Sequence, residues 1–161
     1  MQFPRNFWAG VLLGFVLLAA AQAETRVGDR FPPLAPAPAG RVVVVDFWAS
    51  WCAPCKASFP AYARLHADYA PRGLVIVGVS VDENDAAFAA FVKKFAPPFA
   101  TVRDRDRQLV TRVKVPAMPT CYVLGRDGRV RYVHEGFHGA ATDRALRQEI
   151  DSLLAENPLE T

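Results

Sequence analysis

Cysteine and histidine are scarce in this chain of 161 residues, which contains three of each. A zinc ribbon needs two pairs of ligands, and beyond the Cys52–Cys55 pair only Cys121 is left. Haem attachment needs a histidine directly after the second cysteine, where this chain has Lys56. No histidine has metal-binding spacing to the cysteines, so we predict no metal site. We expect Cys121 to be an inert buried residue, with a third thiol near the site as the alternative.

Charge of one sign is also lacking. The chain has 19 Lys and Arg against 16 Asp and Glu, a net charge of +3 at pH 7. A balance this mild gives no electrostatic argument for binding nucleic acid or an anionic membrane surface. The alternating charges at 103–107 predict a solvated turn rather than a binding patch. There are no internal repeats, and the length suits one domain.

The first 23 residues have the pattern of a secretory signal. Arg5 is followed by an uncharged run at 6–21 and then by Ala21-Gln22-Ala23, which is typical of a cleavage site. The apolar stretch is shorter than the roughly 20 residues that span a bilayer comfortably. We predict cleavage after Ala23 and a periplasmic location if the source is a bacterium. An uncleaved inner-membrane anchor facing the periplasm is the alternative.

The stretch 42–60, VVVVDFWASWCAPCKASFP, organises the rest of the chain. Its valines and the residues after them predict a strand buried on both faces, as in a parallel sheet. Small and apolar residues, Tyr62 among them, then recur at helical spacing to about residue 70. The Cys-x-x-Cys therefore lies where a helix begins, and the free N–H groups and dipole of a first turn favour a thiolate. We predict a redox-active dithiol, because a structural disulfide across so short a loop would contribute little stability.

The positions of the side chains around this motif suggest their roles. Cys52 lies nearer the strand–helix junction and is the predicted nucleophile, and Cys55 is the predicted resolving thiol. Asp46 lies in a strand otherwise too apolar for a carboxylate. A buried, unpaired carboxylate has a raised pKa, which suits a group that takes a proton from Cys55. The alternative is an aspartate that reaches solvent at the strand end. We expect Trp51 to pack around the site and to offer a docking surface.

The rest of the chain predicts a mixed α/β order. Residues 24–40 contain four prolines and predict an extended lead-in with little regular structure, followed by one domain at 41–156. Periodicity, β-branched runs and turn signals predict these elements in order: a strand at 41–47, a helix to about 70 that contains Pro60, a strand at 74–81, a helix capped within 82–85 and ending near 95, a short strand at 99–102, a helix at 109–114, a strand at 121–124, a return strand at 129–134 after an Asp127-Gly128 turn, and a helix from a Thr142 cap to about 155.

The segment DFWASWCAPCK resembles the thioredoxin active site, and residues 42–154 are similar to the TlpA/ResA-like thiol-disulfide oxidoreductases. The resemblance implies a thioredoxin-like α/β fold, with a central mixed β-sheet flanked by helices. The helix–strand–helix stretch after the second strand resembles the TlpA/ResA insertion. Those proteins usually carry a β-hairpin in the lead-in, for which this lead-in is too short and proline-rich. Met118-Pro119-Thr120 resembles the cis-proline loop, which implies a cis bond and a Met118 backbone open to a substrate strand.

The chain departs from the TlpA/ResA pattern at two positions. Thioredoxins carry an aspartate at the position of Asp46, where TlpA/ResA-like proteins more often carry an asparagine. Those proteins have a glutamate three residues after the second cysteine, where this chain has Ser58. Ala53 and Pro54 replace the Gly-Pro dipeptide of typical thioredoxins. The predicted proton acceptor therefore follows the thioredoxin pattern.

The resemblance implies a periplasmic reductant of protein disulfides that uses the Cys52–Cys55 disulfide and no further cofactor. Its implied partners are oxidised secreted proteins, such as apocytochrome c, and a membrane donor of electrons; we expect a monomer. A dithiol oxidase of secreted proteins is an alternative, although such enzymes usually have a histidine inside the motif. A copper-delivery module would need Cys-x-x-x-Cys and a nearby histidine. A thiol peroxidase normally lacks the second cysteine.

Overall fold

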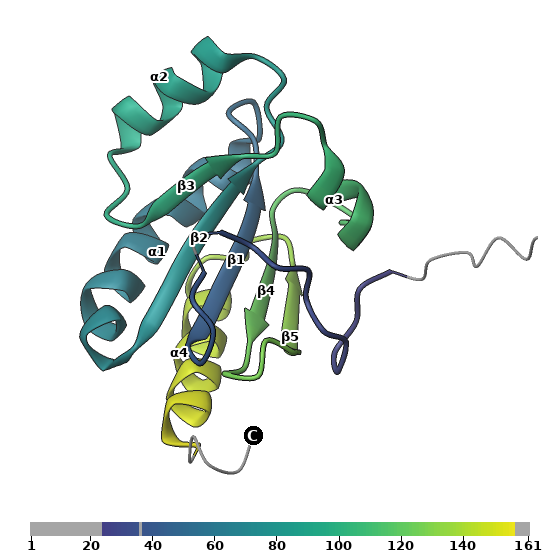
Figure 1. Ribbon diagram of the computed structural model, residues 1–161. Coiled ribbons are helices and arrows are strands. Elements are labelled where there is room, and N and C mark those ends of the chain that lie inside the picture. The colour runs from purple at the N-terminus through teal and green to yellow at the C-terminus, as the bar shows by residue number, and fades with distance from the viewer. Residues whose placement is uncertain (1–23, 36, 157–161) are drawn as a thin grey trace, which may run out of the picture.

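The computed structural model describes residues 24–35 and 37–156, which form a five-stranded sheet with helices on both faces (Figure 1). The predicted signal at 1–23 lies outside the described residues. The strands are β1 (Val42–Trp48), β2 (Leu74–Ser80), β3 (Ala100–Arg103), β4 (Thr120–Leu124) and β5 (Val130–Glu135). The helices are α1 (Ala53–Tyr69), α2 (Asp85–Phe95), α3 (Gln108–Val113) and α4 (Ala140–Ala155), with a 3-10 turn η1 at Ala70–Arg72.

The strand order β3-β2-β1-β4-β5 places β1 at the centre of the sheet. β1 is parallel to β2 and antiparallel to β4, and all of its residues are buried, as its valine run predicted. Phe47, near the end of β1, pairs with Thr120, the first residue of β4. The C-terminal end of β1 and the N-terminal end of β4 therefore lie side by side at one end of the strands, where the cysteine motif begins.

The predicted elements are present, with most bounds moved by a residue or two. The exception is the start of α4, for which the Thr142 cap was wrong. The N-cap is Gly139, whose φ of +60° lies in the left-handed region that favours glycine. Thr142 lies in the first turn instead, where its hydroxyl accepts a hydrogen bond from the His138 N–H at 2.9 Å. It still satisfies a backbone donor of the turn, but from inside the helix.

The stretch that resembles the TlpA/ResA insertion folds as α2, β3 and α3. Asn84 caps α2 by accepting a hydrogen bond from the Ala87 N–H at 3.0 Å. Phe91 of α2 packs on Trp48 of β1, with ring centroids 4.3 Å apart, and on Phe59 of α1 at 4.8 Å. β3 pairs in parallel with β2 at the sheet edge. The inserted segment thus covers the end of the central strand that leads into the cysteine motif.

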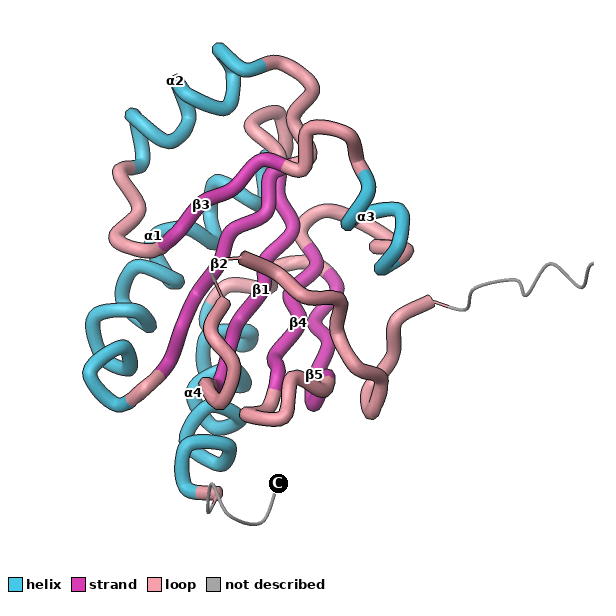
Figure 2. The backbone as a smooth tube through the Cα atoms, in the orientation of Figure 1, coloured by secondary structure: helices cyan, strands magenta, loops and turns pink. Residues whose placement is uncertain are grey.

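The lead-in covers the opposite face of the sheet, where it runs as a loop in front of β1 and β4 (Figure 2). Its only β-contact in the described residues is the bridge from Arg30 to Arg129. Phe31 is buried, and its ring centroid lies 5.5 Å from that of Tyr122 and 6.5 Å from that of Phe47. Because successive strand residues point to opposite faces, the Asp46 side chain lies on the other side, under α1 and α4. None of the helices in the described part of the chain is long and apolar enough to cross a membrane.

Candidate functional site

Cys52 and Cys55 are joined by a disulfide at the beginning of α1. Cys52 is the N-cap residue, and its sulfur accepts a hydrogen bond from the Cys55 backbone N–H at 3.2 Å. Pro54 occupies the first turn, where a helix has no use for its missing N–H. When the pair is reduced, the Cys52 sulfur lies at the positive end of the helix dipole, which favours its thiolate form.

The two cysteines differ little in exposure. Cys52 is 5% exposed and Cys55 is fully buried, which is the order of access that the predicted roles require. Trp51, directly before Cys52, is 69% exposed and is one of two large apolar side chains exposed in the described residues. The indole ring of Trp51 is therefore exposed directly beside the dithiol. The roles of nucleophile, resolving thiol and docking residue remain predictions.

Asp46 is buried on β1 and does not reach solvent, which excludes the alternative considered from the sequence. Its Oδ1 atom accepts a hydrogen bond from the Tyr62 hydroxyl at 2.9 Å. Its Oδ2 atom has no hydrogen-bond partner among the described residues. Burial raises the pKa of the Asp46 carboxyl to about 8, and the bond from Tyr62 opposes that rise. A carboxyl group with this pKa exchanges a proton readily near neutral pH.

The structure adds two residues to the surroundings of Asp46. Cys121 lies opposite Asp46 in the β1–β4 ladder, and it is free and buried, as predicted. Burial and the nearby Asp46 charge both hold the pKa of the Cys121 thiol well above its usual value. The sequence pattern identifies Tyr62 only as an apolar position of the helix. The available signal was that a buried tyrosine hydroxyl requires a hydrogen-bond partner.

Ser58 stands where TlpA/ResA-like proteins carry a glutamate. It is fully buried, and its hydroxyl donates a hydrogen bond to the Cys55 carbonyl at 2.9 Å. The Ser58 side chain therefore bonds to the backbone of its own helix, and it has no carboxylate that could accept a proton. Of the two positions that the family resemblance suggests for a proton acceptor, only that of Asp46 has an acidic group.

The Met118–Pro119 peptide bond is cis, as the resemblance implied. The Thr120 hydroxyl donates to the Ala117 carbonyl at 2.8 Å, and the Gly136 N–H donates to the Pro119 carbonyl at 2.8 Å. These bonds hold the loop at the start of β4. Since β4 begins opposite the C-terminal end of β1, the loop lies at the same end of the strands as the cysteine motif. A role for Met118 and Pro119 in substrate binding remains a prediction.

The sequence pattern predicts for Asp82 only a place in the cap of the helix that follows. Asn84 is the cap, and the Asp82 carboxylate is buried and turned toward Ser50, two residues before Cys52. No signal in the local sequence pointed to this contact. Within 24–35 and 37–156, no group of three or more His, Cys, Asp and Glu side chains is arranged to hold a metal ion.

Comparisons with known proteins agree with this arrangement. The model of the AhpC/TSA family matches residues 33–133. This chain belongs to the AhpC/TSA family. Its relatives include the thiol-disulfide oxidoreductases ResA of Bacillus subtilis, 35% identical over 97 residues, and of Oceanobacillus iheyensis, 32% identical over 97 residues. These matches cover 60% of this AhpC/TSA family member and 54% and 50% of the two relatives, so the chain spans about half their length.

Solved structures show the fold of this family member. It is similar to a Chlorobium tepidum protein described as a candidate thiol:disulfide interchange protein DsbE, with a TM-score of 0.76, 32% identity and coverage of 82% of this chain and 100% of that one. A secreted Mycobacterium tuberculosis disulfide oxidoreductase homologous to E. coli DsbE has a TM-score of 0.62 and 24% identity, over 71% of this chain and 84% of that one. The expected thioredoxin-like fold and the resemblance to TlpA/ResA-like proteins are confirmed.

Proposed function

We propose that this protein is an extracytoplasmic thiol-disulfide oxidoreductase that reduces disulfides in other proteins. The observation that carries the proposal is the bonded Cys52–Cys55 pair at the beginning of α1, with a buried carboxylate, Asp46, on the strand that leads into it. The names of the ResA and DsbE relatives support the same class of reaction. The redox group is the dithiol itself, and the reaction needs no other cofactor.

The reaction has two steps. The Cys52 thiolate attacks one sulfur of a substrate disulfide, the substrate S–S bond breaks, and the other substrate sulfur leaves as a thiolate that takes a proton from water. The Cys55 thiol then gives its proton to the Asp46 carboxylate and attacks the Cys52 sulfur. The mixed disulfide breaks, and the second substrate sulfur leaves as a thiolate that takes a proton from water, so the substrate leaves as a dithiol. Cys52 and Cys55 end as a disulfide, and Asp46 later gives up the proton that it took from Cys55. Two electrons have passed to the substrate.

Substrate proteins would bind around the exposed Trp51 side chain beside the dithiol. The Trp51 ring offers apolar area beside Cys52, and the backbone of Met118 before the cis Pro119 offers hydrogen-bonding groups to an extended segment. Both features recognise an exposed strand with a disulfide rather than a small molecule. This fits oxidised protein substrates, of which an apocytochrome c is one example.

An extracytoplasmic reductant also requires a source of electrons. The secretory pattern at 1–23 supports export to the periplasm or attachment to the inner membrane on that side. In an oxidising compartment the Cys52–Cys55 disulfide is returned to the dithiol only if an outside donor supplies two electrons, and a membrane protein can carry them across the inner membrane. We propose such a donor as the second partner of a monomeric protein.

The reduction potential of the purified protein tests the direction of electron flow. A reductant should have a potential near that of thioredoxin, about −270 mV, whereas a strong oxidase should lie near about −120 mV. A Cys55→Ala variant should accumulate mixed disulfides through Cys52, and mass spectrometry would identify the trapped proteins. Trapping through Cys55 in a Cys52→Ala variant instead would reverse the assigned roles. Consumption of peroxide or tight equimolar copper binding would point to the other functions considered above.

A further inference from the structure

Asp82 is a buried carboxylate that the reaction described above does not use. It lies just beyond the end of β2 and is 3% exposed. The Ser50 N–H lies 3.1 Å from its Oδ1 atom and 3.0 Å from its Oδ2 atom. The Ser50 hydroxyl donates to Oδ1 at 2.8 Å, and the Ser80 hydroxyl donates to Oδ2 at 2.8 Å. A buried charge is unfavourable unless donors surround it, and Ser50 supplies two of the three donors here.

Ser50 belongs to the turn that presents the nucleophile. The Cys52 N–H donates to the Ala49 carbonyl at 3.1 Å, so Ser50 and Trp51 are the two central residues of a tight turn. The carbonyl–amide bond of the turn leaves the Ser50 N–H outside it, and Asp82 accepts that N–H. Asp82 therefore holds the turn from which the Trp51 ring projects into solvent and Cys52 enters α1.

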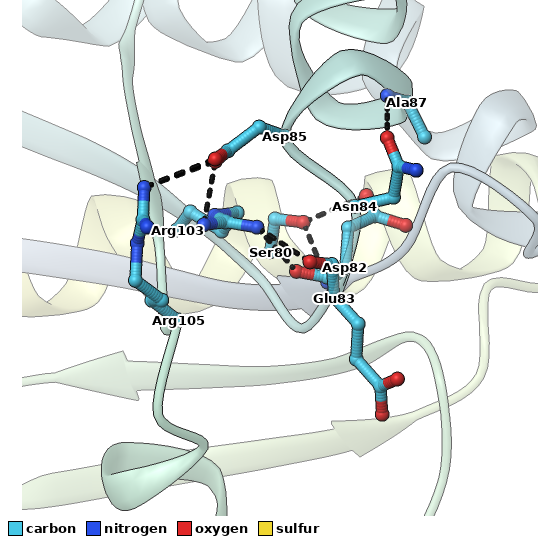
Figure 3. A network of polar contacts seen from close by, with 8 residues as sticks. All are labelled: Ser80, Asp82, Glu83, Asn84, Asp85, Ala87, Arg103 and Arg105. Carbon is cyan, nitrogen blue, oxygen red and sulfur yellow. Dashed lines mark hydrogen bonds and ion pairs between the residues drawn. The ribbon is translucent and has the colours of Figure 1, made fainter.

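The inserted strand β3 contacts Asp82 through the Arg103 side chain, which extends toward Asp82 in Figure 3. Arg103, at the end of β3, donates hydrogen bonds to the backbone carbonyls of Asp82 at 3.3 Å and Glu83 at 2.9 Å. Its side chain is 8% exposed and also pairs with Asp85 at the start of α2. The insertion is thus connected to the nucleophile through a continuous set of contacts, from Arg103 through Asp82 and Ser50 to the turn.

We propose that Asp82 is a positioning residue for Cys52, which acts through Ser50 to hold the nucleophilic sulfur and the Trp51 ring in the geometry for attack on a disulfide. This inference rests on the proposed function. Attack requires the thiolate to lie in line with the S–S bond of the substrate, and a misplacement of about 1 Å lowers a rate by up to about a hundredfold. A residue that only stabilises the fold would leave the rate of the folded protein unchanged.

Two substitutions change the contact in graded steps. Asp82→Asn keeps the shape of the side chain but replaces one acceptor oxygen by an amide that cannot accept from Ser50 or Ser80. Ser50→Ala removes the hydroxyl bond and leaves the Ser50 N–H in place. The matched control is Asp85→Asn, which removes a carboxylate from the same network. The Asp85 side chain is 66% exposed and does not contact Ser50.

The rate at which reduced protein releases thionitrobenzoate from dithiobis(nitrobenzoic acid) measures attack by Cys52 on a small disulfide, and insulin reduction measures attack on a protein. We expect Asp82→Asn to slow both by about tenfold, Ser50→Ala by about threefold, and Asp85→Asn by less than twofold. Adding Ser50→Ala to Asp82→Asn should cause almost no further loss, because both act through one contact. Circular dichroism and urea unfolding establish that each variant is folded at the assay temperature.

Equal rates for Asp82→Asn and Asp85→Asn would overturn the proposal, as would losses that multiply in the double variant. If Asp82→Asn does not fold, Ser50→Ala decides alone, and a wild-type rate in that variant overturns the proposal. The wild-type protein separates this inference from the proposed function. If it fails to reduce insulin, the proposed function fails, while the rates with the small disulfide still decide whether Asp82 positions Cys52.

Discussion

The hydroxyl of Tyr62 should control the pH at which the mixed disulfide is resolved. It donates the only hydrogen bond that the Asp46 carboxyl receives from the described residues. Burial raises the pKa of Asp46 to about 8, and the bond from Tyr62 acts against that rise by stabilising the carboxylate. The other ionisable groups nearby are the Cys121 thiol on β4 and, beyond it, Glu149 on α4, both of which Tyr62→Phe leaves in place.

The size of the effect follows from the chemistry of the bond. A hydrogen bond to a charged group contributes roughly 1.5–3 kcal/mol, and part of this is retained when the carboxyl is protonated. A difference of about 1.4 kcal/mol between the two forms raises the pKa of Asp46 by about one further unit. With a pKa of about 8, about one protein in ten carries the carboxylate at pH 7. In Tyr62→Phe that fraction falls to about one in a hundred, and resolution at pH 7 should slow about tenfold.

Single-turnover reaction with dithiobis(nitrobenzoic acid) separates the two steps. The first equivalent of thionitrobenzoate reports attack by Cys52, and the second reports resolution by Cys55. We expect the second phase of Tyr62→Phe to have its pH midpoint about one unit higher than wild type and to recover the wild-type rate above that midpoint. The first phase should be unchanged.

The matched control is Tyr69→Phe, on the same helix. The Tyr69 hydroxyl donates to Asp151 at 3.1 Å, away from Asp46, so its loss should leave the midpoint of the second phase in place. An unchanged midpoint in Tyr62→Phe would refute the reasoning. A loss of rate that is equal at every pH would also refute it, because it would show damage to the site without a change in proton transfer.

Three further substitutions test other parts of the structure. The pKa of Asp46 is about 8 in the folded protein and near 3.8 in the unfolded chain, so burying this group destabilises the wild type as the pH rises from about 4 to 8. The free energy of unfolding of Asp46→Asn, measured in urea and relative to wild type, should therefore be higher at pH 8 than at pH 4 by on the order of 4 kcal/mol. An equal difference between variant and wild type at the two pH values would contradict this. Phe31→Ala should lose about 3–4 kcal/mol of stability but keep the reactivity of the dithiol, since Phe31 packs on the face of the sheet opposite to Asp46. A comparable loss of dithiol reactivity would contradict the view that the two faces have separate roles. Trp51→Ala should raise KM for insulin several-fold, with stability changed by less than about 0.5 kcal/mol because the ring is exposed; an unaltered KM would remove Trp51 from the docking surface.

Local sequence was sufficient for the elements that carry the site. The run Val42–Val45 predicted a buried strand, and β1 is the fully buried centre of the sheet. The Cys-x-x-Cys was expected at the beginning of a helix because apolar spacing changes there from continuous to helical, and Cys52 is the N-cap of α1. The cis bond before Pro119 was expected from the family resemblance alone, since a trans bond is the default for any single proline.

The partners of the buried polar groups were decided only by the tertiary structure. The Asp46 carboxyl and the Tyr62 hydroxyl are 16 residues apart, and Asp82 meets Ser50 across 32 residues. Periodicity indicates which face of an element is buried, but it does not say which distant side chain will lie opposite a given polar atom. That depends on how α1 packs on the sheet and on how the ends of β1 and β2 are aligned. The sequence therefore determined the dithiol and its strand–helix setting, and packing decided which groups surround it.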